Sequence, residues 1–274
     1  MKNRQPSRSP TTREYQHQPR KRFGQNFLHD ESVIQRIVAV VNPQPADHIV
    51  EIGPGRGAIT RHLLQACDHF EAIELDRDLV AQLNRELLPL KPFILHQGDV
   101  LKFDFARLTD IPKSLRIVGN LPYNISTPVL FHLLTYQHLI KDMIFMLQLE
   151  VVERLAARAG DKNYGRLSLM TQYHCQVEHV FNVPSAAFTP RPKVTSAIVH
   201  LVPHEHPPVQ AQDVACLQNV IRTAFTQRRK TLKNSLKTLI SEEALKALGL
   251  DVTERPENLT LADYAAISDA ITGA

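Results

Sequence analysis

The chain has 274 residues and a formal net charge of +4; 43% of its residues are hydrophobic and 22% are charged. These values exclude a wholly disordered, collagen-like or coiled-coil protein and fit one large domain, alone or with a smaller one. No window approaches the roughly 18 uncharged apolar residues of a membrane-spanning helix, so we expect no membrane partner. The three cysteines are far apart and the N-terminus lacks an apolar signal segment, which favours a reducing, cytoplasmic location.

The positive charge is concentrated in two segments. Residues 1–22 contain seven Lys or Arg and one Glu, a charge of +6, so the rest of the chain sums to −2. Residues 214–241 contain six further Lys or Arg and no acid. Basic patches on a near-neutral body predict a polyanionic partner such as nucleic acid, although a solvated tail and a charged helix face explain them equally well. Residues 1–22 are polar and aperiodic, which predicts a disordered tail.

The pattern from residue 30 onward predicts alternating helices and strands. Asp30 can cap a helix that ends before Pro43. Short apolar runs typical of buried strands follow at 48–52, 70–75, 93–96, 115–119 and 143–149. Helix-period segments lie at 58–66, 77–88 and 126–138. This alternation predicts an α/β fold with a mostly parallel, doubly wound sheet, which two antiparallel strands at 173–182 and 194–202 would complete.

A proline-rich segment, 200–209, separates this region from a helical one. Helical periodicity then covers 213–226, 228–240, 242–248 and 260–272. We therefore predict an α/β domain at 23–207 and a small all-helical domain at 208–274. His200, His204 and His206 lie at this linker, where solvated histidines are the simpler interpretation, and we expect no metal site.

A glycine-rich loop between the first strand and its helix predicts a nucleotide-like cofactor. Gly53 and Gly55 permit a tight turn and close approach of a ligand, and Glu74, 21 residues after Gly53, can accept hydrogen bonds from ribose hydroxyls. The loop by itself does not separate NAD from S-adenosylmethionine. Glu51 would repel a pyrophosphate but favour a cationic cofactor, and Asp99 after the third strand can accept from an adenine amino group.

The segment that ends the fourth strand, Asn120-Leu121-Pro122-Tyr123, predicts chemistry on an exocyclic amine. The Asn120 side-chain oxygen and the Leu121 carbonyl can hold the two N–H groups and stabilise positive charge that develops on nitrogen. Tyr123 can stack on an extruded base for roughly 1–3 kcal/mol. An ordinary strand exit with a half-buried tyrosine is the alternative interpretation.

Together these motifs resemble the ribosomal RNA adenine-N6 dimethyltransferases, and within them the bacterial small-subunit branch, whose loss confers kasugamycin resistance. The resemblance covers about residues 20–270. It is carried by the segments at 25–28 (QNFL), 51–55 (EIGPG), 73–76 (IELD), 98–99 (GD), 120–128 (NLPYNISTP), 164–168 (YGRLS), 188–194 (FTPRPKV) and 227–231 (QRRKT). The first motifs are shared with the large-subunit enzymes, whereas YGRLS and QRRK resemble the small-subunit branch.

The resemblance implies a Rossmann-like class I methyltransferase domain followed by a helical RNA-binding domain. It implies S-adenosylmethionine as cofactor, held by the following residues: Asn26, Leu28, Gly53, Glu74, Asp99 and Asn120. The residues at the target base would be Asn120, Leu121, Tyr123 and Phe188, with Phe188 as the aromatic wall opposite Tyr123. The cations that contact RNA phosphates would begin a helix of the small domain: Arg228, Arg229, Lys230 and Lys233.

The implied reaction is dimethylation of N6 on two adjacent adenosines in a hairpin loop near the 3′ end of small-subunit (16S) ribosomal RNA. The partner would be this RNA in the immature 30S subunit, and we expect the protein to be a monomer. Three alternatives remain open: an adenine-N6 methyltransferase acting on DNA or large-subunit RNA, a non-catalytic ribosome-assembly or transcription factor, and an NAD oxidoreductase.

Overall fold

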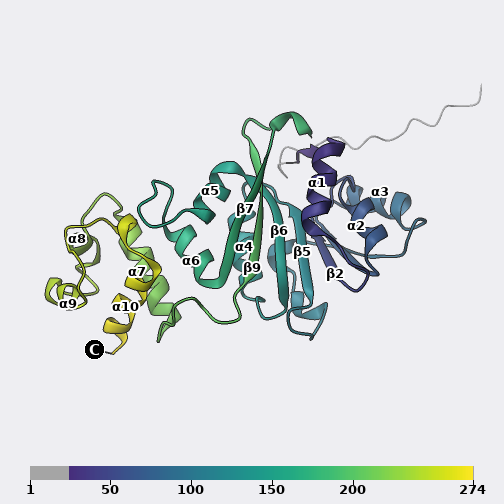
Figure 1. Ribbon diagram of the computed structural model, residues 1–274. Coiled ribbons are helices and arrows are strands. Elements are labelled where there is room, and N and C mark those ends of the chain that lie inside the picture. Colours follow the sequence, from purple (N-terminus) through teal and green to yellow (C-terminus); the bar gives the residue numbers. More distant parts are fainter. Residues whose placement is uncertain (1–24, 274) are drawn as a thin grey trace, which may run out of the picture.

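The computed structural model describes residues 25–273, and its centre is a seven-stranded sheet with helices on both faces (Figure 1). The sheet order is β4-β3-β2-β5-β6-β9-β7; the first five strands are parallel, and β9 is antiparallel to both β6 and β7. The strands are β2 (His48–Ile52), β3 (His69–Glu74), β4 (Ile94–Gln97), β5 (Leu115–Asn120), β6 (Ile140–Gln148), β7 (Cys175–Val183) and β9 (Ser196–Pro203). This arrangement confirms the predicted α/β fold and its antiparallel closing strands.

Helices cover both faces because alternate strand residues are apolar on each side. On one face, α1 (Glu31–Val41), α2 (Thr60–Ala66) and α3 (Arg77–Leu87) share a buried cluster with Ile49 and Val118. On the other, α4 (Ser126–Leu134) and α5 (Leu149–Ala156) pack with Val50 and Ile117. Asp30 caps α1 as predicted, since its side chain accepts hydrogen bonds from the backbone N–H groups of Ser32 and Val33.

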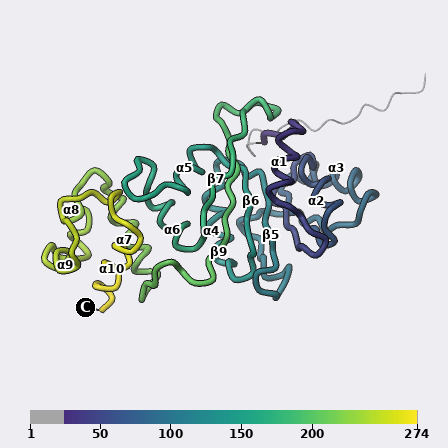
Figure 2. The backbone as a smooth tube through the Cα atoms, viewed as in Figure 1, coloured from purple at the N-terminus to yellow at the C-terminus, as the bar shows by residue number. Residues whose placement is uncertain are grey.

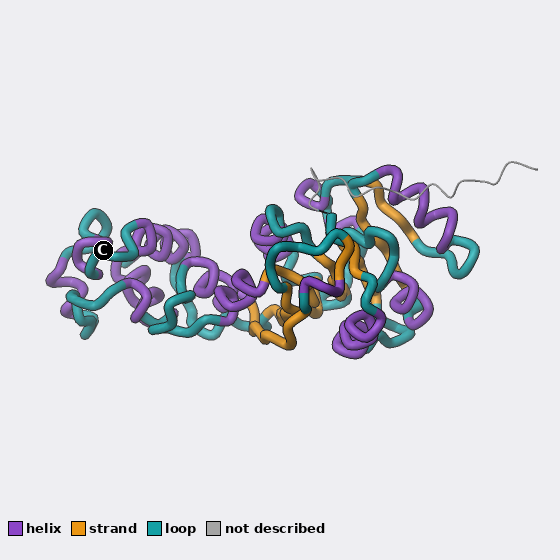
Figure 3. The backbone as a smooth tube through the Cα atoms, turned by 90° about the horizontal axis from the view of Figure 1, so that it is seen from above, coloured by secondary structure: helices purple, strands orange, loops and turns teal. Residues whose placement is uncertain are grey.

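The C-terminal part of the chain forms a helical extension at one end of the molecule (Figures 2 and 3). It contains α7 (Val214–Thr226), α8 (Leu232–Leu236), α9 (Glu242–Ala247) and α10 (Leu261–Thr272). Its buried cluster also includes Leu169, Met170 and Tyr173 of α6 (Arg166–His174), so an element from before the proline-rich linker contributes to the helical core. The division of the chain at 207–208 therefore stays a prediction, and the predicted tail at 1–22 lies outside the described residues.

The prediction of a helix over 228–240 is wrong. α7 ends at Thr226, and α8 begins only at Leu232 and covers five residues. The backbone N–H groups of Leu232 and Lys233 donate to the carbonyls of Glu254 and Val252, so the neighbouring segment satisfies the first turn of α8. Arg228, Arg229 and Lys230 consequently lie in the turn between two helices and not on a helix.

Two very short strands form a second sheet that the pattern does not predict. β1 (Phe27–Leu28) pairs antiparallel with β8 (Phe188–Thr189), and the backbone N–H of His29 donates to the carbonyl of Ala187. Strands of two residues have no periodicity, so only long-range pairing reveals them. The pairing fixes the segment before α1 beside the sheet. Within residues 25–273, no helix combines the length and apolar character needed to cross a membrane.

A buried ion-pair network joins three strand ends at the amino edge of the parallel sheet. Arg116 of β5 donates to Asp142 of β6 at 2.9 and 2.8 Å and to Asp47, just before β2, at 2.7 Å. All three residues are less than 9% exposed. The guanidinium helps to hold the pKa of the Asp142 carboxyl at about 2, against the opposing effect of burial. Because both carboxylates are buried, this cation offsets much of the cost of keeping them charged.

We expect Arg116→Leu to lower the free energy of unfolding by about 3–5 kcal/mol, because it removes the buried cation that pairs with both Asp47 and Asp142. Urea denaturation at pH 7 measures this loss. Lys141→Ala is the matched control: Lys141 also contacts Asp47, at 3.4 Å, but its side chain is 56% exposed, so its loss should cost less than about 1 kcal/mol. Equal costs for the two variants would contradict the assigned role of Arg116.

Candidate active site

The predicted site residues lie in a row along the carboxyl edge of the sheet. In sheet order, Asp99 follows β4, Glu74 ends β3, Gly53 follows β2 and Asn120 ends β5. From β2 the chain continues to β3 and β4 on one side of the sheet and then crosses to β5 on the other side of β2. The order of strands therefore reverses between β2 and β5, and ligands bind at such a switch point in open α/β sheets. One pocket at this edge is lined by all four residues and by Asn26, Leu28, Leu121 and Tyr123.

The glycine loop after β2 has a backbone that residues with a Cβ adopt only under strain. Gly53, Gly55 and Gly57 have φ of +67°, +58° and +77°. The Gly53 N–H donates to the carbonyl of Ile73 at 2.9 Å, which attaches the start of the loop to β3. A Cβ on Gly55 would lie 3.3 Å from the Phe27 ring, so the loop and the segment before α1 pack closely. Arg56 adds a cation–π contact with its guanidinium carbon 4.5 Å from the Phe27 ring centre.

Two glutamates are buried beneath this loop. Glu74 is 7% exposed; its carboxylate accepts from the N–H groups of Asp76 at 2.8 Å and Gly55 at 3.3 Å. Burial nevertheless raises the pKa of Glu74. Glu51 is 2% exposed, and its Oε2 has no hydrogen-bond partner among the described residues. Burial, with the nearby charge of Glu74, raises the pKa of Glu51 to about 7.

Asp99 caps a turn and lines the pocket, and its adenine contact stays a prediction. Its Oδ1 accepts from the Leu101 N–H at 3.0 Å and caps a short 3₁₀ turn, and the residue also lines the pocket. A carboxylate has several acceptor positions, so capping does not exhaust its capacity to bind an amino group.

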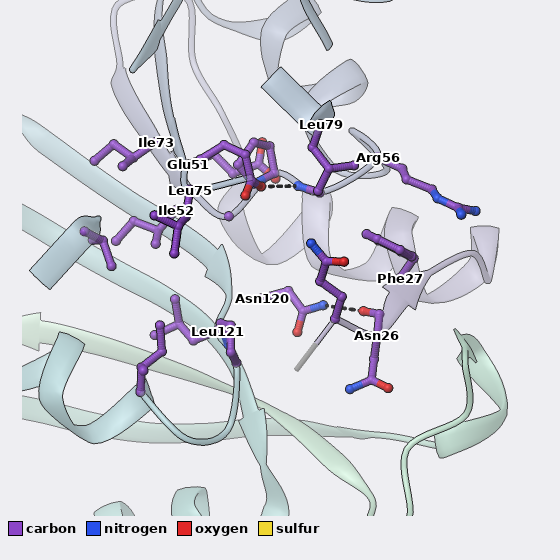
Figure 4. A pocket seen from close by; sticks show the side chains of 18 of the residues that line it. Asn26, Phe27, Glu51, Ile52, Arg56, Ile73, Leu75, Leu79, Asn120 and Leu121 are labelled. Atoms are coloured by element: carbon purple, nitrogen blue, oxygen red, sulfur yellow. Dashed lines mark hydrogen bonds between the residues drawn. The ribbon is translucent and has the colours of Figure 1, made fainter. Parts of the chain in front are cut away.

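Asn120 is held in a fixed orientation by the segment before α1. Its Nδ2 donates to the backbone carbonyl of Asn26 at 3.2 Å (Figure 4). This bond identifies the side-chain oxygen as the acceptor that remains for a ligand. The short β1–β8 ladder positions Asn26 for this contact, since Phe27 and Leu28 pair with Thr189 and Phe188. The sequence suggested Asn26 and Asn120 as site residues but not their contact.

The residues after Asn120 turn away from the sheet at the mouth of the pocket. Leu121 is 1% exposed, and its N–H donates to the carbonyl of Met146 at 3.2 Å. Tyr123 is half-buried, and its hydroxyl lies 2.9 Å from Ser196 Oγ of β9. The contact with Ser196 holds the ring of Tyr123 at the pocket.

Phe188 lies in the apolar core beside the site, and its role at the target base stays a prediction. It is 3% exposed, belongs to the apolar cluster with Leu28 and Val183, and is absent from the residues that line the pocket. Its pairing with Leu28 across the β1–β8 ladder explains this burial. Phe188 therefore packs against the segment before α1, whereas Tyr123 lines the pocket.

The comparisons with known proteins agree with this geometry. The profile described as "Ribosomal RNA adenine dimethylase" matches residues 16–272. The chain is similar to the Ribosomal RNA small subunit methyltransferase A of Pseudomonas putida, with 54% identity over 94% of this chain and 97% of that protein. Its counterpart in Pseudomonas fluorescens is 55% identical over 95% and 96% of the two chains.

The chain belongs to the ribosomal RNA adenine dimethylase family.

Two solved structures share the fold of this chain. A dimethyladenosine transferase from Plasmodium falciparum has a TM-score of 0.76 and 26% identity, covering 88% of this chain and 95% of its own. The 23S rRNA methyltransferase ErmE, at 24% identity and a TM-score of 0.72 over 90% of this chain and 100% of its own, shares the fold.

This member of the dimethylase family also has a cationic surface pocket that the sequence reading did not assemble. Four arginines, from α5, α6, α7 and the turn after α7, line it: Arg154, Arg166, Arg222 and Arg228. Tyr164 and Phe225 lie among them, with ring centres 6.5 Å apart. Arg228 is partly engaged, because it donates to Glu257 and to the carbonyl of Lys162. Arg154 is far in sequence from the basic stretch, so only the packing of α5 and α6 against α7 reveals the pocket.

The linker histidines have ordinary partners. His200 lies on β9 and not in the linker as predicted, and its Nε2 lies 3.1 Å from Asp142 Oδ2. His204 Nε2 lies 3.2 Å from the carbonyl of Gln172. Over residues 25–273, no three side chains of His, Cys, Asp or Glu gather in an arrangement that could hold a metal ion.

We expect Gly119→Ala to destabilise the dimethylase fold by about 1–3 kcal/mol or more, because a Cβ on Gly119 would lie 2.7 Å from the backbone oxygen of Ile52. The collision would separate β2 from β5 directly behind Gly53 and Asn120. Thermal and urea unfolding measure the effect. Gly98→Ala is the matched control, since Gly98 also lines the pocket but has no atom within 4 Å of its added Cβ; a similar loss there would contradict the explanation.

Proposed function

We propose that this protein transfers methyl groups from S-adenosylmethionine to N6 of two adjacent adenosines in a hairpin loop near the 3′ end of small-subunit ribosomal RNA. Each adenosine would receive two methyl groups, in the immature 30S subunit, with the protein acting as a monomer. The observation that carries the proposal is the row of acceptors at the carboxyl edge of β4, β3, β2 and β5. The names of the Pseudomonas relatives support the choice of small-subunit RNA.

The pocket fits this cofactor in its length and its polarity. Adjacent strands are about 4.8 Å apart, so the four strands offer an edge of roughly 14 Å, long enough for an extended nucleoside joined to an amino acid. Asp99 would take the adenine amino group and Glu74 the ribose hydroxyls, while Gly53, Asn26 and Leu28 would hold the remainder. The unpartnered, buried oxygen of Glu51 suits a cationic ligand and opposes a pyrophosphate, which disfavours NAD.

Asn120 and Leu121 would hold the amine that is methylated. When bound, S-adenosylmethionine supplies an electrophilic methyl group. The Asn120 oxygen, which the Asn26 contact leaves available, and the Leu121 carbonyl would accept the amine's two N–H groups. This orientation directs the nitrogen lone pair away from both acceptors and stabilises positive charge as the nitrogen attacks. The alkylated nitrogen then loses a proton, so no strong base is needed.

Tyr123 would stack on the extruded adenine, and the bond to Ser196 keeps its ring in place. Phe188 stays a proposed second wall only if the 188–194 segment rearranges when RNA binds. The cations of the helical region would bind phosphates without reading sequence: Arg228, Arg229, Lys230 and Lys233, together with Arg154, Arg166 and Arg222 of the surface pocket.

Methyl transfer to isolated ribosomal particles tests the proposal. Labelled S-adenosylmethionine is incubated with small-subunit particles that lack the modification, and the RNA is digested to nucleosides. We expect labelled N6,N6-dimethyladenosine in small-subunit RNA. Label in large-subunit RNA or DNA, or binding of the cofactor without transfer to any substrate, would contradict the proposal.

Asn120→Ala should reduce the methylation rate by about 10²–10³-fold, because it removes an acceptor that acts on developing charge. Single-turnover methylation of small-subunit particles measures the rate. RNA affinity should remain near wild type, since the phosphate-binding cations are unchanged. A wild-type rate would contradict the role of Asn120.

Tyr123→Ala should weaken base binding by roughly 1–3 kcal/mol, whereas Tyr123→Phe should retain most of the activity, because stacking needs the ring. Tyr123→Phe also loses the bond to Ser196, at a cost to folding of about 1 kcal/mol, which thermal unfolding detects. Equal losses of activity in both variants would indicate that the hydroxyl, and not the ring, is required.

Arg229→Ala should weaken RNA binding and reduce the slope of log affinity against log salt by about 1, because one phosphate contact is lost. Titrations at several salt concentrations measure the slope. Arg85→Ala, on α3 at the other end of the molecule, is the control and should leave the slope unchanged (Figure 1). Identical slopes for all three proteins would exclude Arg229 from the RNA interface.

A further inference from the structure

Glu51 occupies an unusual position for a carboxyl group. It lies on β2, an inner strand of the sheet, where its partners in register are Ala72 of β3 and Val118 of β5. It lines the cofactor pocket, it is 2% exposed, and its Oε2 has no hydrogen-bond partner among the described residues (Figure 4). Glu74, by contrast, accepts two backbone N–H groups. Glu51 is therefore the carboxylate of this pocket whose charge the protein itself compensates least.

The other charged groups near Glu51 do not neutralise it. Glu74, at the end of β3, has the same sign, and so has Asp99 after β4. Arg56 in the glycine loop packs over the Phe27 ring, and α2 contributes the uncharged hydroxyl of Thr60. Burial and the charge of Glu74 raise the pKa of Glu51 to about 7. Near pH 7 the free protein is thus a mixture of protonated and ionised Glu51.

We propose that Glu51 selects the cofactor by charge: it gives up its proton when the cationic methyl donor binds, and its carboxylate then favours the donor over the thioether product. The proposal rests on the proposed function, because it takes S-adenosylmethionine as the ligand. It assigns Glu51 to specificity, a role distinct from the ribose and adenine contacts of Glu74 and Asp99.

The physical basis is the cost of a buried charge without a partner. An isolated carboxylate in an apolar site is unfavourable, and protonation avoids that cost in the free protein. Both ligands carry an α-ammonium and an α-carboxylate group, and the methyl donor also carries a sulfonium where its product, S-adenosylhomocysteine, has a neutral thioether. The donor therefore has one more positive charge than the product, and a nearby carboxylate attracts the donor more strongly. The ionised form of Glu51 therefore binds donor preferentially and favours release of product.

The direction in which donor affinity changes with pH follows from the coupling between ligand binding and proton release. A ligand that prefers ionised Glu51 lowers its pKa and displaces a proton. Donor affinity should rise by about tenfold between pH 6 and pH 8 through this one group, and then level off above the pKa of the free protein. The cofactor's own α-amino group titrates near pH 8, so the comparison with a variant lacking the carboxyl isolates the contribution of Glu51.

Calorimetry of the full-length protein tests the proposal without any methyl transfer. S-adenosylmethionine is titrated at pH 7 in buffers of different ionisation enthalpy, and the buffer dependence of the heat gives the number of protons released. We expect the wild type to release about half a proton more than Glu51→Gln. We also expect Glu51→Gln to weaken the binding of S-adenosylmethionine several-fold more than that of S-adenosylhomocysteine. Equal proton counts, or an unchanged ratio of the two affinities, would overturn the proposal.

Glu71→Gln is the matched control. Glu71 is also a buried glutamate of the sheet, but it pairs with His48 and His96 and does not line the pocket. Its substitution should leave proton release and the affinity ratio at wild-type values. If Glu71→Gln reproduced the Glu51→Gln result, the effect would be a general one of lost buried charge, and the proposal would fail.

A second measurement decides the matter if Glu51→Gln does not fold or bind. Carbon NMR of side-chain-labelled glutamate follows the Glu51 carboxyl in the wild type, assigned by the signal that is absent from Glu51→Asp. We expect titration near neutral pH in the free protein and an ionised signal at pH 7 with S-adenosylmethionine. An unchanged protonation state would overturn the inference alone, whereas failure of the wild type to bind S-adenosylmethionine would overturn the proposed function.

Discussion

The close pairing of β2 with β5 is the constraint on which the rest of the site depends. The two strands are neighbours in the sheet although α2, β3, α3 and β4 lie between them in sequence, and Gly119 allows the backbone of Ile52 to approach where any side chain would collide. The residues that follow, Gly53 and Asn120, are thereby placed side by side at the switch point. The glycine loop after β2 and the turn after β5, the proposed cofactor and substrate sites, meet because the backbones of β2 and β5 pack closely at Gly119.

Around that pair, the segment before α1 connects the parts of the pocket. Phe27 packs against Gly55 and Arg56, the Asn26 carbonyl holds the Asn120 amide, and Leu28 pairs with Phe188. A single short segment therefore contacts the glycine loop, the proposed catalytic amide and the segment that the resemblance assigns to the base pocket. At the opposite edge of the sheet, Arg116 joins β5 to β6 and to the residue before β2, so the strands are held together independently of the loops that make these contacts.

The chemistry proposed for the site follows from which of its buried polar groups have hydrogen-bond partners within the protein. Glu74 and Asp99 have backbone partners that fix their orientation, and Asn120 has one, so each presents its remaining acceptor in a defined direction. Glu51 lacks such a partner and is sensitive to the charge of whatever enters the pocket. At the carboxyl edge of the sheet, we thus assign the orientation of the ligands to Glu74, Asp99 and Asn120, and the selection of the cofactor by charge to Glu51.

The sequence by itself determined the alternation of strands and helices, the glycine loop and the capped first helix. It also determined that Glu74 and Asn120 each lie at the end of a strand. All of these features depend on local periodicity and local backbone preference. Only the tertiary structure decided the β1–β8 ladder, the burial of Phe188, the short α8 and the convergence of Arg154 with Arg222. Each of these depends on contacts between distant segments: Leu28 with Phe188, and Leu232 with Glu254, satisfy groups that no local pattern reveals. Residue identity shows what chemistry a side chain can perform, whereas long-range packing decides which side chains are placed to perform it together.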